Sequence, residues 1–569
     1  MRFRLALAFA APIVVAACGR PLQKQPAVVA APAPATITVG IVVDQLAAWI
    51  ADERLGELPD SGGFARLRRE GAYARDVRYA HAVTDTAPGH AALYTGKVPR
   101  ESGIYANEVF EGDAGPVRAI VFDATKNLVG EGGPASAPGA SLARLDVPTL
   151  ADTLRSVRPD ADIVAISVKD RGALFGGGRA PNASLWFDSK SDAFVTSTAF
   201  AQALPTWARE HASHASLEAL RAPAWTLLDP GWVSSHARTA DAQLGEGDDN
   251  GYGTTFPHLV SASKKPGAAF RTSPYADVAV VRLAIDAIAA HDPKKPMLLA
   301  LSLSANDTIG HLFGPDSWEA WDNLRRLDVA LAALFAALDA KVGEERWSVA
   351  LTGDHGASTL PEAADVARPW CASSTPDFWE RPCGPLGRVV GDVLADSVEA
   401  EVRKSLGKAA PPGRIVRGII DPYLYFTHEV LALPEAERAT VEAAVRAALL
   451  ATAGVAGVTA YAPAECPPAR SESIDALVCR STSAKTAGAL YIVTKPGYFF
   501  DAGYVVGKGS SHGAPYLYTR SVPLLVRSPH RVVPGTVDRA PRPFTAFASS
   551  LAAMLRLRFT SPPEDSLVH

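Results

Sequence analysis

Two pairs of residues with metal-binding side chains stand close together in the sequence. Asp307 and His311 are four residues apart, so on a helix both side chains project from one face and can bind one ion. Asp354 and His355 are adjacent and lie between two glycines. Neighbouring residues on a strand point to opposite faces, so joint binding requires a turn, which the flanking glycines permit. Carboxylate oxygens and imidazole nitrogens are ligands that suit zinc.

Two further residues could complete such a site from distant parts of the chain. His512 lies in the segment Gly-Lys-Gly-Ser-Ser-His-Gly, a glycine-rich loop that can bring an imidazole to a remote site. Asp44 directly follows the apolar run 37–43. Singly, each residue has an ordinary explanation as a helix cap, a surface group or a solvated loop residue. A common location at one sheet edge would favour a metal site over those explanations.

Thr86 is a candidate nucleophile, followed by Ala-Pro-Gly-His and the apolar run 91–94. Threonine followed shortly by proline is typical of a helix start, so a plain N-cap is one interpretation. The same position also favours chemistry, because a hydroxyl there lies at the positive end of the helix dipole and exposed amides bind phosphate. A bound metal ion would lower the pKa of the hydroxyl further. The local sequence leaves both interpretations open.

Four apolar runs of strand length end abruptly near polar residues that could belong to such a site. The runs are 37–43 before Asp44, 163–168 before Lys169, 297–303 before Asp307 and 348–352 before Asp354. Nearly continuous apolar runs predict strands that are buried on both faces, as in parallel sheets. In such sheets ligands bind beyond the carboxyl ends of the strands, where these polar residues would lie.

Helical patterns separate the predicted strands. A Ser-Pro pair opens a helix over 273–290, and leucines at spacings of three and four over 324–338 form one apolar helix face. Lys341 and Gly343 are typical of the end of that second helix. Alternating strands and helices predict an α/β fold, in which a mostly parallel sheet is sandwiched by helices.

The segment at about 371–494 breaks this alternation. It contains paired cysteines, proline-rich turns and a predicted helix at 435–451. It does not continue the pattern of apolar strands that end at polar candidate site residues. We interpret it as a subdomain inserted into a catalytic domain that spans 36–569. Two glycine-rich stretches, 112–139 and 245–253, are predicted to be long surface loops.

The N-terminus is typical of an export signal. A basic start, Met-Arg-Phe-Arg, precedes an apolar run of 14 residues that ends at Cys18. This run is shorter than the roughly 20 residues that cross a bilayer. Its last residues, Val-Ala-Ala-Cys, resemble a bacterial lipobox, which would imply acylation of Cys18; an ordinary signal peptide with a chance cysteine is the alternative. We predict a signal peptide or lipobox over 1–18, a flexible linker over 19–35, and an exported, periplasmic protein that acylated Cys18 would tether to a membrane.

Four cysteines remain beyond Cys18, in two close pairs. An even number of cysteines is what an oxidising compartment permits. Four cysteines allow three connectivities, and easy closure of short loops favours Cys371–Cys383 and Cys466–Cys479. Neither pair has the C-x2-4-C spacing of a zinc knuckle. We therefore predict two disulfides.

The overall composition argues against two broad classes of protein. Hydrophobic residues make up 48% and charged residues 20% of the 569 residues, which disfavours a disordered chain. Lys and Arg number 56 against 60 Asp and Glu, for a formal net charge of -4. This balance gives no basic surface for a polyanion, so no nucleic-acid partner is expected.

Several motifs together resemble one known family. In chain order they are Val43-Asp44-Gln45, Thr86 to Ala91, Gly103 to Asn107, Lys169 to Gly172, Asp307 to His311 with Phe313-Gly314-Pro315, Gly353 to Gly356, and Ser511-His512-Gly513. The set resembles the alkaline phosphatase superfamily and is most similar to its PafA-type members, which use threonine as the nucleophile. The motifs extend from Asp44 to His512 in family order.

This resemblance implies an alkaline-phosphatase-like α/β fold and a phosphate monoester hydrolase. Such an enzyme forms a phosphothreonine at a site with two Zn²⁺ ions and releases inorganic phosphate. The implied ligands are Asp307, His311 and His512 for one zinc, and Asp44, Thr86, Asp354 and His355 for the other. The implied catalytic and phosphoryl-binding residues are Thr86, Asn107, Lys169 and Arg171.

A charge count separately favours a monoester substrate. Two Zn²⁺ ions with three aspartates carry a charge of +1, and an ionised Thr86 brings this centre to zero. Lys169 and Arg171 then add two positive charges, which match the dianion of a monoester. A diester brings one negative charge and a second substituent where these donors would lie. A charged triplet such as Lys-Asp-Arg is ordinarily a solvent-exposed surface segment. This triplet directly follows a predicted buried strand, which favours a place at the site instead.

Other activities remain as alternatives. The closest is a phosphodiesterase or nucleotide pyrophosphatase of the same superfamily, against which Lys169 and Arg171 argue. A sulfatase would need a C-x-P-x-R signature, and no cysteine lies near Thr86. The segment around Ser511 matches the G-x-S-x-G nucleophile elbow, but Pro515 interrupts the helix that should follow. A non-catalytic lipoprotein that keeps the fold as a binding module is the most distant alternative.

Overall fold

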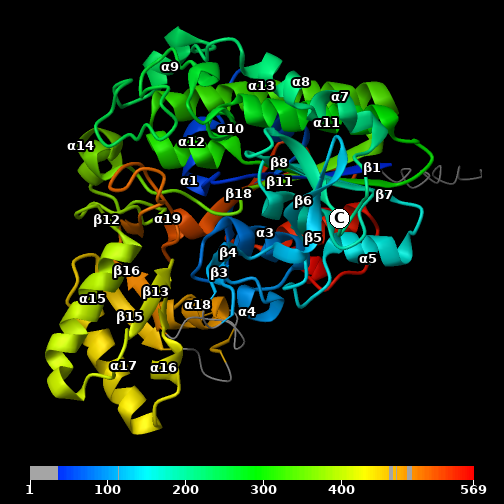
Figure 1. The fold of residues 1–569 in the computed structure, drawn as a ribbon. Coiled ribbons are helices and arrows are strands. Elements are labelled where there is room, and N and C mark those ends of the chain that lie inside the picture. Colours follow the sequence, from blue (N-terminus) through cyan, green and yellow to red (C-terminus); the bar gives the residue numbers. More distant parts are fainter. Residues whose placement is uncertain (1–35, 113–114, 461–465, 469–470, 483–489) are drawn as a thin grey trace, which may run out of the picture. The chain divides into compact units, whose positions relative to one another are not determined.

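The structure is a computed structural model that describes residues 36–112, 115–460, 466–468, 471–482 and 490–569 (Figure 1). The predicted signal segment, the linker and Cys18 lie outside these ranges. Within them the strands form a 12-stranded sheet, a four-stranded sheet and two two-stranded sheets. None of the helices in this part of the chain is long and apolar enough to cross a membrane.

Five parallel strands form the middle of the large sheet. In spatial order they are β11 (Trp347–Thr352), β1 (Ile37–Val43), β10 (Met297–Leu303), β7 (Asp162–Ser167) and β8 (Ala183–Asp188). The first four contain the apolar runs that the sequence predicts as strands, so these four predictions are confirmed. Every residue of β1, β10 and β11 is buried, which explains their unbroken apolar character.

Antiparallel pairs extend the sheet on both sides of this centre. β18 (Ser521–Arg527) and β2 (Ala72–Arg78) follow β11, while β9 (Ala193–Ser197), β5 (Phe122–Gly130) and β6 (Gly133–Ala140) follow β8. The short strands β19 (Thr536–Asp538) and β20 (Arg542–Pro543) pair with β2 in parallel. The fold is therefore α/β with a mostly parallel central sheet, as predicted.

The prediction of a surface loop over 112–139 is wrong. The hairpin β5–β6 and the short strand β4 (Val117–Ala119) occupy most of that stretch. Most side chains of β6 are exposed, so the strand lacks the apolar alternation that would have revealed it. Backbone pairing and a turn in which Gly133 has a φ of 92° hold the hairpin instead. The other glycine-rich stretch, 245–253, contains no helix or strand, as predicted.

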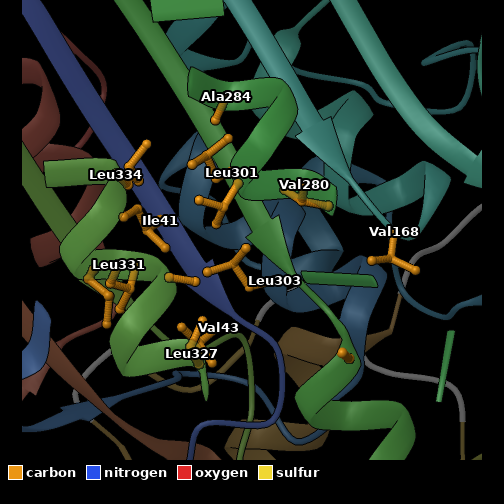
Figure 2. Packing of buried hydrophobic residues seen from close by; sticks show 14 of the residues in the cluster. Ile41, Val43, Val168, Val280, Ala284, Leu301, Leu303, Leu327, Leu331 and Leu334 are labelled. Atoms are coloured by element: carbon orange, nitrogen blue, oxygen red, sulfur yellow. The ribbon is translucent and has the colours of Figure 1, made fainter. Parts of the chain in front are cut away.

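Helices cover both faces of the sheet. On one face lie α11 (Tyr275–Ala290) and α13 (Trp318–Val342), which match the two predicted helices. Figure 2 shows this packing with Ile41, Val43, Leu301 and Leu303 from the strands and Val280, Ala284, Leu327, Leu331 and Leu334 from the helices. On the other face lie α3 (Thr86–Thr95), α6 (Asp170–Gly177) and α20 (Thr545–Met554).

A second sheet has a hydrophobic core of its own. Its strands are β13 (Val416–Ile420), β14 (Tyr423–Phe426), β16 (Leu490–Thr494) and β15 (Val455–Ala460). Two helices pack against it, α15 (Gly391–Leu406) and α17 (Glu435–Leu450), the second of which matches the helix predicted at 435–451. These elements lie inside the segment 371–494, whose limits as an inserted subdomain stay a prediction. Close to it, β12 (Gly387–Val389) pairs with β17 (Tyr498–Phe500).

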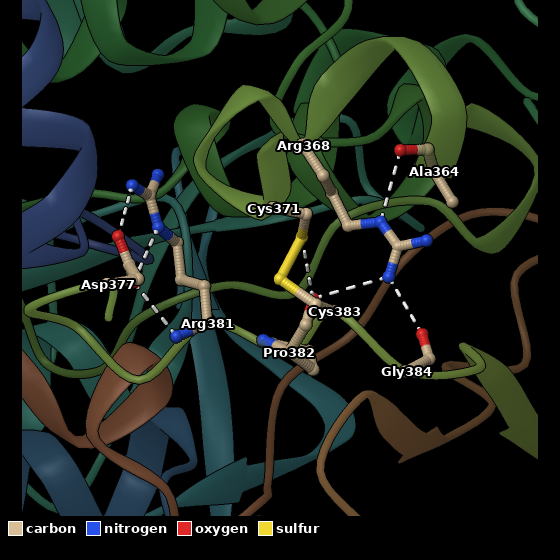
Figure 3. Close-up of a disulfide and its surroundings, with 8 residues drawn as sticks. All are labelled: Ala364, Arg368, Cys371, Asp377, Arg381, Pro382, Cys383 and Gly384. Carbon is tan, nitrogen blue, oxygen red and sulfur yellow. Dashed lines mark hydrogen bonds and ion pairs between the residues drawn. A yellow bond between two sulfur atoms is a disulfide. The ribbon is translucent and has the colours of Figure 1, made fainter. Parts of the chain in front are cut away.

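Both predicted disulfides are present. Cys371 bonds to Cys383 and Cys466 bonds to Cys479. Figure 3 shows the first of them together with two arginines from the same segment. Arg368 donates hydrogen bonds to the carbonyl oxygens of Ala364, Pro382 and Gly384. Arg381 pairs with Asp377 at 2.8 Å and with Glu53 of α1 (Ala48–Arg54) at 2.6 Å, which connects the cross-linked segment to the main domain.

Candidate active site

The ends of three neighbouring strands bring the predicted acidic residues together. Asp44 directly follows β1, Asp354 lies two residues after β11, and Asp307 lies in α12 (Ala305–Phe313), the helix after β10. Because β11, β1 and β10 are adjacent and parallel, their carboxyl ends lie at one sheet edge. All three carboxylates are at most 1% exposed.

Asp307, His311 and His512 form the first cluster. α12 places Asp307 and His311 one turn apart, with 3.1 Å between His311 Nε2 and Asp307 Oδ1. His512 comes from the irregular segment after β17, and its Nε2 lies 3.2 Å from His311 Nε2 and 3.5 Å from Asp307 Oδ1. The three ligand atoms lie within 4.8 Å of one another, a spacing that one metal ion can bridge.

Asp44, Asp354 and His355 form the second cluster, and their ligand atoms also lie within 4.8 Å of one another. His355 Nε2 is 3.3 Å from Asp44 Oδ1 and 3.6 Å from Asp354 Oδ2. The flanking glycines allow close packing at this turn. A Cβ on Gly353 would come within 2.5 Å of the Leu46 carbonyl oxygen, so a larger residue would displace the turn.

Backbone carbonyl groups orient all three histidines. The Nδ1 atom of His311 lies 2.8 Å from Ser510 O, that of His355 lies 3.0 Å from Gly356 O, and that of His512 lies 2.7 Å from Thr84 O. A carbonyl oxygen only accepts, so each Nδ1 carries a hydrogen and each Nε2 is directed toward its cluster. This arrangement is typical of metal-binding histidines.

The chemistry of both clusters fits a metal cation. His355 Nε2 is buried and forms no hydrogen bond within the described ranges, and the buried Asp354 Oδ2 lies 3.1 Å from His90 Nδ1. Burial alone would raise the pKa of Asp307, but the charges of His311 and Lys169 outweigh burial and hold that pKa well below its usual range. The buried Asp307 carboxylate is therefore ionised, and positive charge beside it is favourable. Carboxylates together with imidazoles are a donor set that suits zinc.

Lys169 connects the two clusters and faces the candidate nucleophile. Its Nζ lies 2.7 Å from Asp44 Oδ2 and 2.5 Å from Asp307 Oδ2, and it donates a hydrogen bond of 3.2 Å to Thr86 Oγ1. Burial would lower the pKa of Lys169, but the charges of Asp307 and Asp44 outweigh burial and raise it. The ammonium group is therefore charged beside the Thr86 hydroxyl.

The N-cap interpretation of Thr86 does not describe its position. Asp85 occupies the N-cap of α3, and Thr86 is the first helical residue. The Asp85 side chain makes no capping hydrogen bond. The Thr86 hydroxyl instead lies at the positive end of the α3 dipole, where it faces Lys169.

Asn107 and Arg171 lie on the same cavity as Thr86 and Lys169. Asn107 Oδ1 accepts a hydrogen bond of 2.8 Å from the backbone N–H of Ala87, which holds it beside the start of α3. Arg171 lies in the first turn of α6. The cavity has a volume of about 600 Å³ and also reaches the first metal-ligand cluster.

Two residues that the sequence analysis left without a role contact this site. Gln45 donates its backbone N–H to Asp354 Oδ1 and its Nε2 to Asp307 Oδ1, both at 3.0 Å. The His90 ring lies 2.9 Å from Thr86 O through Nδ1 and 2.9 Å from Ser302 Oγ through Nε2. His90 is four residues after Thr86, a helical spacing that could have revealed it. No local pattern distinguishes Gln45.

The nucleophile-elbow alternative lacks its structural context. Ser511 lies on irregular chain that does not directly follow a strand. The next helix, α19 (Leu517–Arg520), has only four residues and begins six positions later. A nucleophile elbow requires a sharp turn from a strand into a helix.

Comparisons with known proteins identify relatives of this chain. Alkaline phosphatase PhoV of Synechococcus elongatus is 33% identical over 57% of this chain, and the match spans 60% of PhoV. A Myroides odoratus protein named calcium-transporting ATPase is 27% identical over 92% of both chains. Alkaline phosphatase PafA of Elizabethkingia meningoseptica is 27% identical over the same share of both chains. A crystal structure of PafA superposes with a TM-score of 0.79 and 25% identity over 93% of this chain and 97% of that one.

A profile of the type I phosphodiesterase / nucleotide pyrophosphatase family matches residues 38–514. This range contains every residue of both clusters as well as Thr86, Asn107, Lys169 and Arg171. The match covers far more than half of the chain. The chain therefore belongs to the type I phosphodiesterase / nucleotide pyrophosphatase family, within the alkaline phosphatase superfamily.

Proposed function

We propose that the protein is a phosphate monoester hydrolase, an alkaline phosphatase that works through a phosphothreonine at a site with two Zn²⁺ ions. One observation carries the proposal: Lys169 lies between the two ligand clusters and donates to the Thr86 hydroxyl. The names of two relatives, PhoV and PafA, support the same class of activity.

The proposed ligands are the two clusters described above, with Thr86 as a further ligand of the second. Asp307, His311 and His512 would bind one zinc ion, and Asp44, Asp354, His355 and Thr86 the other. When bound, the two ions would lower the pKa of the Thr86 hydroxyl and neutralise negative charge on the leaving oxygen. The carbonyl-bound histidines need no rearrangement to take part, because each already directs Nε2 into its cluster.

Thr86 is the proposed nucleophile. Its Oγ would form a bond to phosphorus while the bond from phosphorus to the leaving oxygen breaks, which gives phosphothreonine. Water would then cleave the phosphothreonine and release inorganic phosphate. Lys169, 3.2 Å from Thr86 Oγ1, would stabilise negative charge at the reacting oxygen and on the transferring phosphoryl group.

Lys169, Arg171 and Asn107 are the proposed phosphoryl-binding residues. Together they offer two cationic donors and one amide donor on a single cavity. A monoester has free oxygens for these donors, whereas a diester carries a second substituent there. A phosphodiesterase or nucleotide pyrophosphatase activity, which the family's name describes, is the alternative.

Export to the periplasm and a membrane tether through acylated Cys18 are part of the proposal. They rest on the sequence of residues 1–35 alone. A phosphatase of small phosphate esters in that compartment would also be consistent with two disulfides.

The experiment is a substrate panel with controlled metal content. Phosphate release from aryl monoesters and from matched aryl methyl diesters is measured with zinc-loaded protein, after chelation, and after zinc is restored. We expect monoester turnover to dominate, to disappear on chelation and to return with zinc, with about two zinc ions per active chain by elemental analysis. Fewer than one zinc per fully active chain would contradict the two-zinc assignment, and dominant diester turnover would favour the alternative.

A further inference from the structure

The cavity that contains Thr86 changes character from its floor to its rim. At the floor, Thr86, Lys169 and Asp307 are each at most 4% exposed. The rim includes exposed side chains from three separate segments, among them Glu108, Asp392 and Val506. The phosphoryl group would lie at the floor, so the rim is the part of the cavity that contacts the leaving group of a substrate.

The rim carries negative charge. Glu108 of β3 (Glu108–Phe110), Asp392 in the first turn of α15, and Asp501 all line the cavity. Asp501 also accepts hydrogen bonds from the backbone of Gly503 at 2.8 Å and Gly507 at 2.7 Å, so it shapes its own loop.

No lysine or arginine among the described residues of the rim balances this charge. Among the described residues that line the cavity, the only lysine and arginine are Lys169 and Arg171, which belong to the floor. Two further acidic residues line the cavity, but Asp85 pairs with His512 at 3.1 Å, and burial together with Asp85 raises the pKa of Asp421 well above the usual range, so neither adds to the charge of the rim. The net charge of the rim therefore rests on Glu108, Asp392 and Asp501.

Apolar side chains fill the space between these carboxylates. Val117 is 39% exposed and Val506 is 69% exposed, and both line the cavity. Ile419 and Ile420 of β13 add a further apolar surface from the second sheet. Of the described rim residues, a leaving group would contact apolar and acidic side chains and no lysine or arginine.

We propose that the site selects monoesters whose leaving group is apolar and neutral or cationic, and that it discriminates against leaving groups with a second anionic group, such as nucleoside polyphosphates and sugar bisphosphates. This inference rests on the proposed function, because it assigns the phosphoryl group to the floor. In this proposal the segment that contains α15 and β13 forms one wall of the cavity. Its side chains would distinguish leaving groups by their charge.

The test compares three aryl monoesters that differ in charge: phenyl phosphate, 4-(carboxymethyl)phenyl phosphate and 4-(trimethylammoniomethyl)phenyl phosphate. kcat/KM is measured for the zinc-loaded full chain and for the Glu108→Gln/Asp392→Asn variant, at low and at high salt. The variant Glu437→Gln/Asp475→Asn is the matched control, because it removes two exposed acidic residues that do not line the cavity. Comparing proteins with the same three esters cancels the intrinsic reactivity of each leaving group.

We expect the cationic-to-anionic ratio of kcat/KM to fall about fivefold to tenfold in the rim variant at low salt, and much less at high salt. The matched control should keep the wild-type ratio. A ratio that is the same in the wild type and the rim variant would overturn the inference, provided that phenyl phosphate is still hydrolysed. Absence of phenyl phosphate hydrolysis by the zinc-loaded wild type would instead overturn the proposed function. If the double variant does not fold, Glu108→Gln alone provides the same comparison.

Discussion

At the scale of single residues, the role of Thr86 depends on its position at the first turn of α3, opposite the Lys169 ammonium. Thr86→Ala keeps the six proposed carboxylate and imidazole ligands but removes the proposed attacking oxygen. We expect kcat/KM for an aryl monoester to fall by several orders of magnitude. Thr86→Ser keeps a hydroxyl and should retain part of the activity.

The proposed covalent step can also be tested directly. Acid quenching of the wild type with a labelled monoester should give a phosphopeptide that contains Thr86, and Thr86→Ala should give none. Ser511→Ala serves as the control, since Ser511 lines the same cavity. A label on Ser511 would exclude Thr86 as the nucleophile.

Gln45 is a positioning residue that contacts both clusters. Its N–H and its Nε2 hold Asp354 and Asp307 respectively, and it does so with a φ of 65°, which is unfavourable for a residue with a Cβ. We expect Gln45→Ala to weaken zinc binding by about tenfold or more, because groups that orient metal ligands typically have effects of that size. Zinc Kd is measured by competition with a chromophoric chelator.

The matched control for Gln45→Ala is Gln243→Ala, which alters a glutamine outside both clusters. The variant keeps the backbone N–H that contacts Asp354, so an unchanged Kd in Gln45→Ala would show that Asp307 holds its orientation without the Gln45 amide.

At the scale of elements, the site depends on the adjacency of β11, β1 and β10, and each of these strands was predictable from an unbroken apolar run. The helix α12 was not predicted by itself, because the spacing of Asp307 and His311 shows only that the two side chains would share a face if the segment were helical. The hairpin β5–β6 was not, because most β6 side chains are exposed and its pairing is a backbone property. Sequence patterns report burial, so an edge hairpin with little burial leaves no such signal.

A buried carboxyl group lies behind α12. Glu246 is 6% exposed, and neither of its carboxylate oxygens has a hydrogen-bond partner within the described ranges. Burial, together with the nearby Glu319, raises the pKa of Glu246 to about 10 from an ordinary value of 4.5. The next residue, Gly247, donates its N–H to Leu312 O in α12, at 2.9 Å.

This raised pKa predicts a pH dependence of stability. Between pH 4.5 and about 10 the folded protein keeps the Glu246 proton while the unfolded chain loses it, so stability from this group falls as the pH rises. Glu246→Gln removes that loss. We expect its stabilising effect on the free energy of unfolding to grow between pH 5.5 and pH 9 and to reach at least about 1 kcal/mol at the higher pH. The measurement is denaturant unfolding at each pH.

The exposed Glu437→Gln is the control for this series and should show no such trend. A stabilising effect of Glu246→Gln that is the same at both pH values would contradict a buried, protonated Glu246.

At the scale of the whole molecule, residues more than 400 positions apart contribute to one site, as the contact between His512 and Thr84 shows. The predicted ligands could be grouped because strand ends share a sheet edge and because the motifs resemble a known family. Three features could not be predicted: the bridging position of Lys169, the double contact of Gln45, and the acidic rim. Each depends on the relative placement of side chains from different elements, which no local pattern records.

Substitution of Lys169 and Arg171 is the most direct test of the central claim, which is that the site is specific for phosphate monoesters. The measurement is kcat/KM for an aryl monoester and its matched aryl methyl diester in the wild type and in Lys169→Ala/Arg171→Ala. Lys190→Ala/Arg209→Ala, which removes two exposed cations outside the cavity, is the control. Zinc content is determined for each protein, because Lys169 also contacts Asp44 and Asp307.

A charge-assisted hydrogen bond contributes about 1.5–3 kcal/mol, so loss of both donors should cost the monoester several kcal/mol of transition-state stabilisation. The diester should lose much less, because one of the oxygens that these donors would contact is esterified. The predicted result is therefore a large fall in the ratio of monoester to diester kcat/KM at unchanged zinc content. Equal losses for the two substrates would contradict a monoesterase site and would favour the phosphodiesterase alternative.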